Sequence, residues 1–317
     1  MPDDIRPRGI GDLPAQRPLT PRTAAEARGR FFNTGNAFNI INPPVPDHAF
    51  VEEPRLALDD ATPTGLISCD ISGILKCEFP ATSPLVLARY ARIRTGEMLM
   101  TDFVASGTIA YVIQGSGITD CDGERIVWAD GDVFVLPGGI AATHEASATA
   151  VLWLVTNEPQ LAFENLRAPS PGEAPTDLVH YRADEIDRQI ALLYEVGRDA
   201  TTAGSALVLS ARRQEATRNI LPTLTAAMNS LPPGSAQPPH RHNSVAVSLI
   251  IQGDNCFSII DGKPKAWSHW ATTITPPVAV HSHHNAGTEQ ARFLIIQDGG
   301  IYYHARAMGF EFAEQPA

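Results

Sequence analysis

The chain of 317 residues is 44% hydrophobic and 19% charged, with 26 prolines and 24 glycines, a composition that fits a folded, turn-rich protein better than a disordered one. Its formal net charge of -11 argues against nucleic acid or an anionic membrane surface as the main partner, because either would reward a basic face. We find no apolar stretch of about 18 residues and no apolar leader, so we expect no membrane span, no secretion and a cytoplasmic location.

Residues 1–60 are expected to form an N-terminal tail and arm outside the compact domains. Residues 1–24 are rich in proline and arginine and have no periodic apolar pattern. An arm of this length can clasp a second copy of the chain, so we expect a homo-oligomer.

Residues 61–160 are expected to form a first β-barrel. They contain the short strand-like segments LVLARYARI, AYVIQGSGITDC, ERIVWA, DVFVLPGG and TAVLWLVT, each closed by glycine, aspartate or proline. No helical pattern separates these segments, which predicts antiparallel strands.

Residues 161–205 are interpreted as a linker. The segment NEPQLAFENLRAPSPGEAPTD is rich in proline, serine and glutamate, as interdomain connections are. After it, the apolar spacing of Ile186, Ile190 and Leu193 predicts a helix over Ala183 to Val196.

Residues 206–317 return to the strand-like pattern in TLTAAMNSL, VAVSLIIQG, NCFSIIDG, TTITPP and RFLIIQD. The two halves keep a common register, because five landmarks in the first half recur 138 or 139 residues later. The pairs are Gly96 and Gly234, Asp102 and His240, Gly115 and Gly253, Pro137 and Pro276, and Ala142 and His281. A repeat of this length predicts a duplicated β-barrel.

Six of the ten histidines lie between residues 240 and 284. In PPHRHNS, His240 and His242 fall on the same face of a strand, because side chains alternate with a period of two. The segment TPPVAV precedes His281, which an antiparallel barrel can bring beside the first pair. Three imidazoles would hold one divalent ion and leave positions open for a substrate.

These residues resemble the two motifs of the cupin superfamily. The first motif, G-x5-H-x-H-x3-E-x6-G, is matched by Gly234, His240, His242, Ala246 and Gly253, with alanine in place of glutamate. The second, G-x5-P-x-G-x2-H-x3-N, is matched by Trp270, Pro276, Val278, His281 and Asn285, with both glycines replaced. The resemblance implies an all-β fold of two tandem cupin barrels with an N-terminal arm and a short linker helix.

The segments HRHNSVAVSLIIQG, IIDGK and TPPVAVHSHHN are similar to the gentisate and salicylate dioxygenase branch of the cupins, which also lacks the motif glutamate. This similarity implies an enzyme that holds Fe(II) on His240, His242 and His281 and uses O2 to cleave the ring of a small hydroxylated aromatic, gentisate-like or related enolisable compound. By position, His283 matches a histidine that hydrogen-bonds to the bound substrate or relays a proton to it.

The sequence departs from that branch in three places. The ligand positions of the first barrel are Asp102, Val104 and Ala142, so this barrel is expected to hold no metal. The arginine that the family uses to hold a substrate carboxylate is Ser248, and the aromatic pair before the third ligand is Val278 and Val280. Four arginines are candidates to replace the missing one: Arg212, Arg213, Arg241 and Arg292.

Two other functions remain open from the sequence. One is a redox-neutral lyase, isomerase or hydrolase with Mn, Ni or Zn as a Lewis acid, and the other is a bicupin that binds a small molecule without catalysis. We interpret His144, His269 and His284 as structural histidines, with His284 as the alternative to His283, and Trp267 as a candidate pocket wall.

Overall fold

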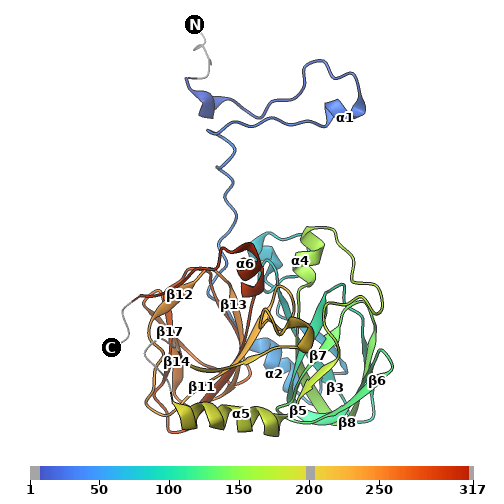
Figure 1. Cartoon of the computed structure of the whole chain (residues 1–317), viewed down its shortest axis with the longest axis vertical. Coiled ribbons are helices and arrows are strands. Elements are labelled where there is room, and N and C mark those ends of the chain that lie inside the picture. Colours follow the sequence, from blue (N-terminus) through green and yellow to red (C-terminus); the bar gives the residue numbers. More distant parts are fainter. Residues whose placement is uncertain (1–7, 198–203, 314–317) are drawn as a thin grey trace. The chain divides into compact units, whose positions relative to one another are not determined.

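The computed structural model describes residues 8–197 and 204–313. Contacts divide the chain into two compact units, Met1–Pro43 and Pro44–Ala317. The described part of the first unit, dark blue in Figure 1, contains η1 (Ile10–Asp12), α1 (Ala24–Ala27) and an isolated bridge between Gln16 and Phe31. All three sheets of the structure belong to the second unit.

The first barrel is built on one antiparallel sheet of eight strands, drawn mainly in green in Figure 1. The strands follow the order β2-β3-β8-β5-β7-β9, with β4 added on β8 and β6 on β5. Their bounds are β2 (Gly65–Ser68), β3 (Leu87–Ile93), β4 (Met98–Thr101), β5 (Gly107–Cys121), β6 (Glu124–Trp128), β7 (Val133–Pro137), β8 (Ala142–Thr156) and β9 (Val179–Tyr181). The long strands β5 and β8 pair along most of their length.

The second barrel consists of two antiparallel sheets. The six-stranded sheet contains, in order, β1 (Ala49–Phe50), β16 (Thr272–Thr275), β13 (Ala246–Gln252), β18 (Ala291–Gln297), β11 (Thr225–Leu231) and β10 (Ser205–Leu209). The five-stranded sheet contains β15 (Lys263–Ala266), β14 (Cys256–Ile260), β17 (His281–Asn285), β12 (His240–His242) and β19 (Phe310–Phe312). The predicted pair of tandem β-barrels is confirmed, while the limits 61–160 and 206–317 stay predictions.

Helices in the second unit are short and lie between strands. The predicted linker helix is confirmed as α5 (Ala183–Val196), which buries Ile186 and Ile190. The others are α2 (Glu52–Leu58), α3 (Ser72–Leu75), α4 (Glu158–Phe163), η2 (Arg212–Gln214) and α6 (Gly299–Ala305). Among the described residues, no helix has both the length and the hydropathy needed to cross a bilayer.

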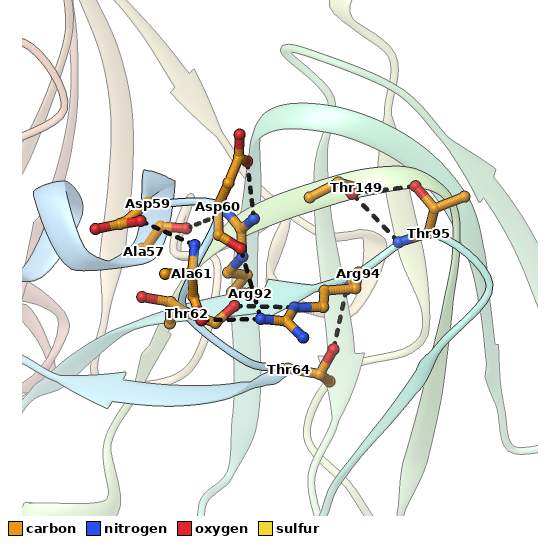
Figure 2. A network of polar contacts seen from close by, with 10 residues as sticks. All are labelled: Ala57, Asp59, Asp60, Ala61, Thr62, Thr64, Arg92, Arg94, Thr95 and Thr149. Carbon is orange, nitrogen blue, oxygen red and sulfur yellow. Dashed lines mark hydrogen bonds and ion pairs between the residues drawn. The ribbon is translucent and has the colours of Figure 1, made fainter.

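Arg92 on β3 and Arg94 just after it tie the segment between α2 and β2 to the first barrel (Figure 2). The buried Arg92 donates to the Ala57 carbonyl at 2.9 Å and pairs with Asp60 at 3.2 Å. Arg94 donates to the carbonyls of Ala61 and Thr62 at 2.9 and 3.1 Å. Because a buried guanidinium is costly without acceptors, these contacts fix the path of the chain into the barrel.

The largest hydrophobic core lies between the two barrels. Strands β3, β5 and β8 contribute Tyr90, Ile109 and Trp153 from their outer face, and β13 contributes Val247 and Leu249. A second cluster fills the interior of the first barrel with Phe134, Leu152 and Leu154 among others. The cluster inside the second barrel is smaller, because the histidines and a cavity occupy part of that interior.

A hydrogen-bonded group crosses the boundary between the barrels. The buried Thr272 hydroxyl accepts from Trp153 Nε1 at 2.9 Å and lies 2.8 Å from the hydroxyl oxygen of Tyr90, which itself donates to the Trp270 carbonyl. The two barrels therefore share polar contacts as well as apolar surface.

Replacing Thr272 by valine is expected to destabilise the protein by about 1–3 kcal/mol, because the shape is kept while Trp153 and Tyr90 lose a buried partner. Urea unfolding of the metal-free protein measures this change. The matched control is Thr273→Val on the next, less buried position, which should change stability by no more than about 0.5 kcal/mol. Equal stability of both variants would contradict a structural role for the group.

Two turns keep the same backbone conformation in both barrels, although the glycines of the first barrel are replaced by other residues in the second. Gly131 and Gly139 in the first barrel have φ of 84° and 79°, and their counterparts Trp270 and Val278 keep positive φ of 63° and 58°. Side chains disfavour this conformation, especially when β-branched. The turn at Val278 is held by its own amide, which donates to the His242 carbonyl at 2.7 Å.

Candidate metal centre

Three histidine rings meet inside the second barrel. His240 and His242 lie on β12, and His281 begins β17, where it pairs directly with His240. Each ring offers one nitrogen, and these nitrogens all lie within 4.8 Å of one another. The predicted alternation of β12 is confirmed, because the intervening Arg241 is exposed and pairs with Glu311.

The Nδ1 atom of each ring donates to a backbone carbonyl. For His240, His242 and His281 in turn, the acceptors are Pro238 at 2.8 Å, Ser244 at 2.9 Å and Ala279 at 2.9 Å. Since a carbonyl only accepts, the proton is on Nδ1 and the lone pair is on Nε2. Three Nε2 lone pairs are thus available to one ion, the arrangement that metal-binding histidines use.

The three rings are electrically neutral near pH 7. Burial lowers the pKa of His242 to about 4, and it also lowers the pKa of His240. The pKa of His281 falls to about 2, mainly through burial and further through the charge that neighbouring rings would carry. Neutral imidazole is the form that binds metal, so no proton has to leave when an ion enters.

This donor set fits a divalent transition metal such as Fe(II), Ni(II) or Zn(II), all of which imidazole suits. Two nitrogens bound to one ion at about 2.1 Å each lie at most about 4.2 Å apart, so an ion would draw the rings closer than the present separation of up to 4.8 Å. Three protein donors leave further coordination positions free, as in catalytic rather than structural sites.

A cavity of about 310 Å³ opens beside the three rings. Its wall is mainly apolar, with Ala246, Ile295 and Phe310 among the residues that form it. Three carboxamides also line it: Asn229, Gln237 and Gln297. Among the described residues, no arginine, lysine, aspartate or glutamate lines this cavity.

None of the four candidate arginines replaces the family's carboxylate-binding arginine in this cavity wall. Arg212 and Arg213 pair with Asp177, Arg241 pairs with Glu311, and Arg292 pairs with Asp187. Ser248, which stands at the arginine's position in the motif, is buried on β13. A charge that enters the cavity therefore meets dipoles and the metal site rather than a cation of the described chain.

His283 lies beside the metal cluster and lines the cavity. Trp267 Nε1 donates to Ser258 Oγ at 2.8 Å, and this hydroxyl lies 2.8 Å from Nδ1 of His283. The Ser258 hydroxyl, which accepts from tryptophan, can either donate to Nδ1 of His283 or accept from it, so the contact fixes the orientation of the ring in both tautomers. Burial lowers the pKa of His283 to about 3, so the ring is neutral near pH 7.

The first barrel repeats this triad 139 residues earlier without the metal cluster. Trp128 Nε1 donates to Thr119 Oγ1 at 2.8 Å, and this hydroxyl lies 2.8 Å from Nδ1 of His144. The other ring nitrogen of His144 lies 3.1 Å from the Thr101 hydroxyl, so both nitrogens of this ring have hydrogen-bond partners within the barrel. His144 is fully buried, and burial lowers its pKa to about 4.

The positions in the first barrel that correspond to the three histidines do not form a metal-binding cluster. Asp102 and Val104 are exposed, and Ala142 is buried without a donor atom in its side chain. Among the described residues, the group able to hold a metal is His240, His242 and His281. The site of the described chain is thus confined to the second barrel.

The remaining histidines and Trp267 take other places. His284 stacks on Phe257 and hydrogen-bonds to Ser282, and His269 stacks on Trp270. Trp267 lies behind His283 rather than in the cavity wall. The sequence interpretation missed the carboxamides of the cavity, which only the strand register brings beside the metal cluster.

The chain thus has a two-barrel, bicupin-type fold, in which the second barrel holds the histidine cluster. The solved salicylate 1,2-dioxygenase from Pseudaminobacter salicylatoxidans superposes with a TM-score of 0.73 over 88% of this chain and 92% of that one, at 15% identity. Its adduct with gentisate gives a TM-score of 0.70 over 88% of each chain, at 14% identity. These matches show the fold.

The chain also resembles curated dioxygenases in sequence. It is 31% identical over 80 residues to a gentisate 1,2-dioxygenase from Ralstonia sp., which covers 25% of this chain and 22% of the relative. It is 30% identical over 122 residues to a 5-aminosalicylate 1,2-dioxygenase from Comamonas sp., covering 37% and 32%. The matched segments thus span about a quarter to a third of these relatives. No protein-family profile matches the chain.

Proposed function

We propose that this protein is a non-haem Fe(II) dioxygenase that uses O2 to cleave the ring of a small hydroxylated aromatic or related enolisable compound. One observation carries the proposal: three buried imidazoles, each held at Nδ1 by a backbone carbonyl, turn their Nε2 atoms toward the same cavity. The distant relation to gentisate-type dioxygenases supports the same chemistry.

His240, His242 and His281 would hold the iron. When bound, Fe(II) would bring substrate and O2 together on one ion and exchange electrons with both. Because all three ligands are neutral, the full charge of the ion is available to stabilise an ionised hydroxyl of the substrate. Mn, Ni and Zn are alternative occupants of the same donor set.

His283 would position the substrate rather than bind the metal. Its Nδ1 would accept from the Ser258 hydroxyl, and its Nε2 proton would then donate to an oxygen of a molecule in the cavity. The carboxamides of Asn229 and Gln237 offer further neutral hydrogen bonds there. The apolar remainder of the wall would keep water from the reacting atoms.

The cavity favours a substrate that reaches the metal through hydroxyl or enol oxygens. A ring carboxylate beyond the metal's reach would find no cation in the described wall, and burying an unpaired charge is costly. Catechols and aminophenols satisfy the metal with two adjacent donors and need no such cation. We therefore place neutral chelating compounds ahead of hydroxybenzoates within the proposed substrate class.

Metal analysis of protein purified without oxygen, followed by an oxygen-electrode screen, tests the proposal. The expected result is about one iron per chain and O2 uptake with catechols or aminophenols. Turnover that continues without O2, with Mn, Ni or Zn in place of iron, would contradict it and favour a redox-neutral cupin enzyme. Ligand binding that survives metal removal, with no turnover, would contradict it in favour of a binding protein.

A further inference from the structure

A glutamine side chain reaches the metal-binding face of His242. Gln297 is the last residue of β18, and its amide nitrogen lies 3.1 Å from Nε2 of His242. The Nδ1 proton of this ring already goes to the Ser244 carbonyl, so Nε2 carries the lone pair and Gln297 donates to it. The carboxamide therefore contacts the ring nitrogen to which an ion would bind.

The register of the sheet explains why Gln297 reaches this place. Gln297 pairs directly with Ala246 on β13. Residues that stand opposite each other in a sheet project to the same face about 5 Å apart. Ala246 is the position where the common cupin motif has its glutamate, and its methyl group leaves that volume to the neighbouring strand. Both residues line the cavity beside the histidines.

The end of β18 is fixed by the residue that follows. Asp298 is 2% exposed, and its Oδ1 accepts from the backbone amide of Val245 at 2.8 Å. This bond joins the end of β18 to the start of β13, next to Ala246. The backbone that carries Gln297 is therefore anchored, and the freedom of the residue lies in its side chain.

We propose that Gln297 is a fourth protein group of the metal centre, whose carboxamide oxygen takes the side of the ion that a carboxylate takes in other cupins. The inference rests on the proposed metal site at His240, His242 and His281. Once an ion takes the Nε2 lone pair, the amide nitrogen has no acceptor there, and a half-turn of the carboxamide presents its oxygen instead. A neutral oxygen donor keeps the charge of the ion uncompensated.

Binding of Co(II) by the full chain, measured without O2 by competition with a chromogenic chelator, tests this role independently of catalysis. Gln297→Ala is expected to weaken Co(II) binding about 10–100-fold, the usual cost of losing a supporting group at a metal site. Gln297→Glu should bind Co(II) at least as tightly as the natural protein, because a carboxylate supplies an anionic oxygen in the same place. The visible spectrum of bound Co(II) should differ between the alanine variant and the natural protein.

Gln237→Ala is the matched control, since Gln237 also lines the cavity but hydrogen-bonds to Asn229 and not to a ring. It should leave Co(II) affinity unchanged. Thermal unfolding of the metal-free variants shows whether each is folded. Unchanged affinity in Gln297→Ala, or weakened binding of a catechol alone, would overturn the proposal for Gln297. Absence of Co(II) binding by the natural protein would instead overturn the metal centre itself.

Discussion

Replacing His281 by alanine is expected to lower the affinity for Fe(II) by more than about 100-fold, since loss of a mere supporting group already costs about 10–100-fold. His281 is the ligand that links β17 to the pair on β12, and it is 3% exposed. Its removal leaves two imidazoles, too few to hold the ion against water. O2 uptake should fall with the iron content, which elemental analysis of protein reconstituted without oxygen measures.

His284→Ala is the matched control for this variant. His284 lies three residues further along β17, but its ring stacks on Phe257 and bonds to Ser282, away from the cavity. It should keep both iron and activity. If His281→Ala folds, as circular dichroism can show, and still binds one iron per chain with the original affinity, the three histidines are not the metal site.

The substrate preference should follow the charge of the cavity. We expect kcat/KM for 4-methylcatechol to exceed that for 3,4-dihydroxybenzoate, whose carboxylate is not adjacent to a hydroxyl, by about 10–100-fold. The two compounds have the same chelating hydroxyls and differ by a methyl group in place of a carboxylate. The missing hydrogen bonds to that charge are worth about 1.5–3 kcal/mol, which corresponds to this ratio. Oxygen uptake at matched concentrations measures it.

A higher kcat/KM for the carboxylate compound would contradict the inferred substrate class. It would mean that a cation reaches the cavity from outside the residues that line it here, for example from a second copy of the chain. Metal binding would be unaffected by that result, so the metal centre and the substrate class fail separately.

Much of the architecture follows from local pattern. The helix at Ala183–Val196 was predictable because its apolar residues recur at helical spacing and nothing in the tertiary structure opposes it. The convergence of His240, His242 and His281 was predictable because strand periodicity and the internal repeat together constrain where three side chains can point.

What the sequence left open depends on contacts between distant strands. Nothing in RFLIIQD distinguishes Gln297, which becomes important only because β18 lies beside β13 and Ala246 is small. Likewise, four arginines were equal candidates for the cavity until ion pairs with carboxylates accounted for each. The repeat did contain one unused signal, since Trp128, Thr119 and His144 precede Trp267, Ser258 and His283 at the same interval.

The closed triad of the first barrel bears on how the two halves could be redesigned. In the first barrel the Thr101 hydroxyl hydrogen-bonds to Nε2 of His144, whereas the counterpart histidine of the second barrel, His283, lines the cavity. Replacing the residues at positions 102, 104 and 142 by histidine would therefore not create a second metal site with an open cavity. Such a design would also have to remove the Thr101 hydroxyl and replace large apolar side chains around Phe134 by smaller ones. The first barrel is thus filled with packed side chains, and the cavity beside the histidine cluster belongs to the second barrel.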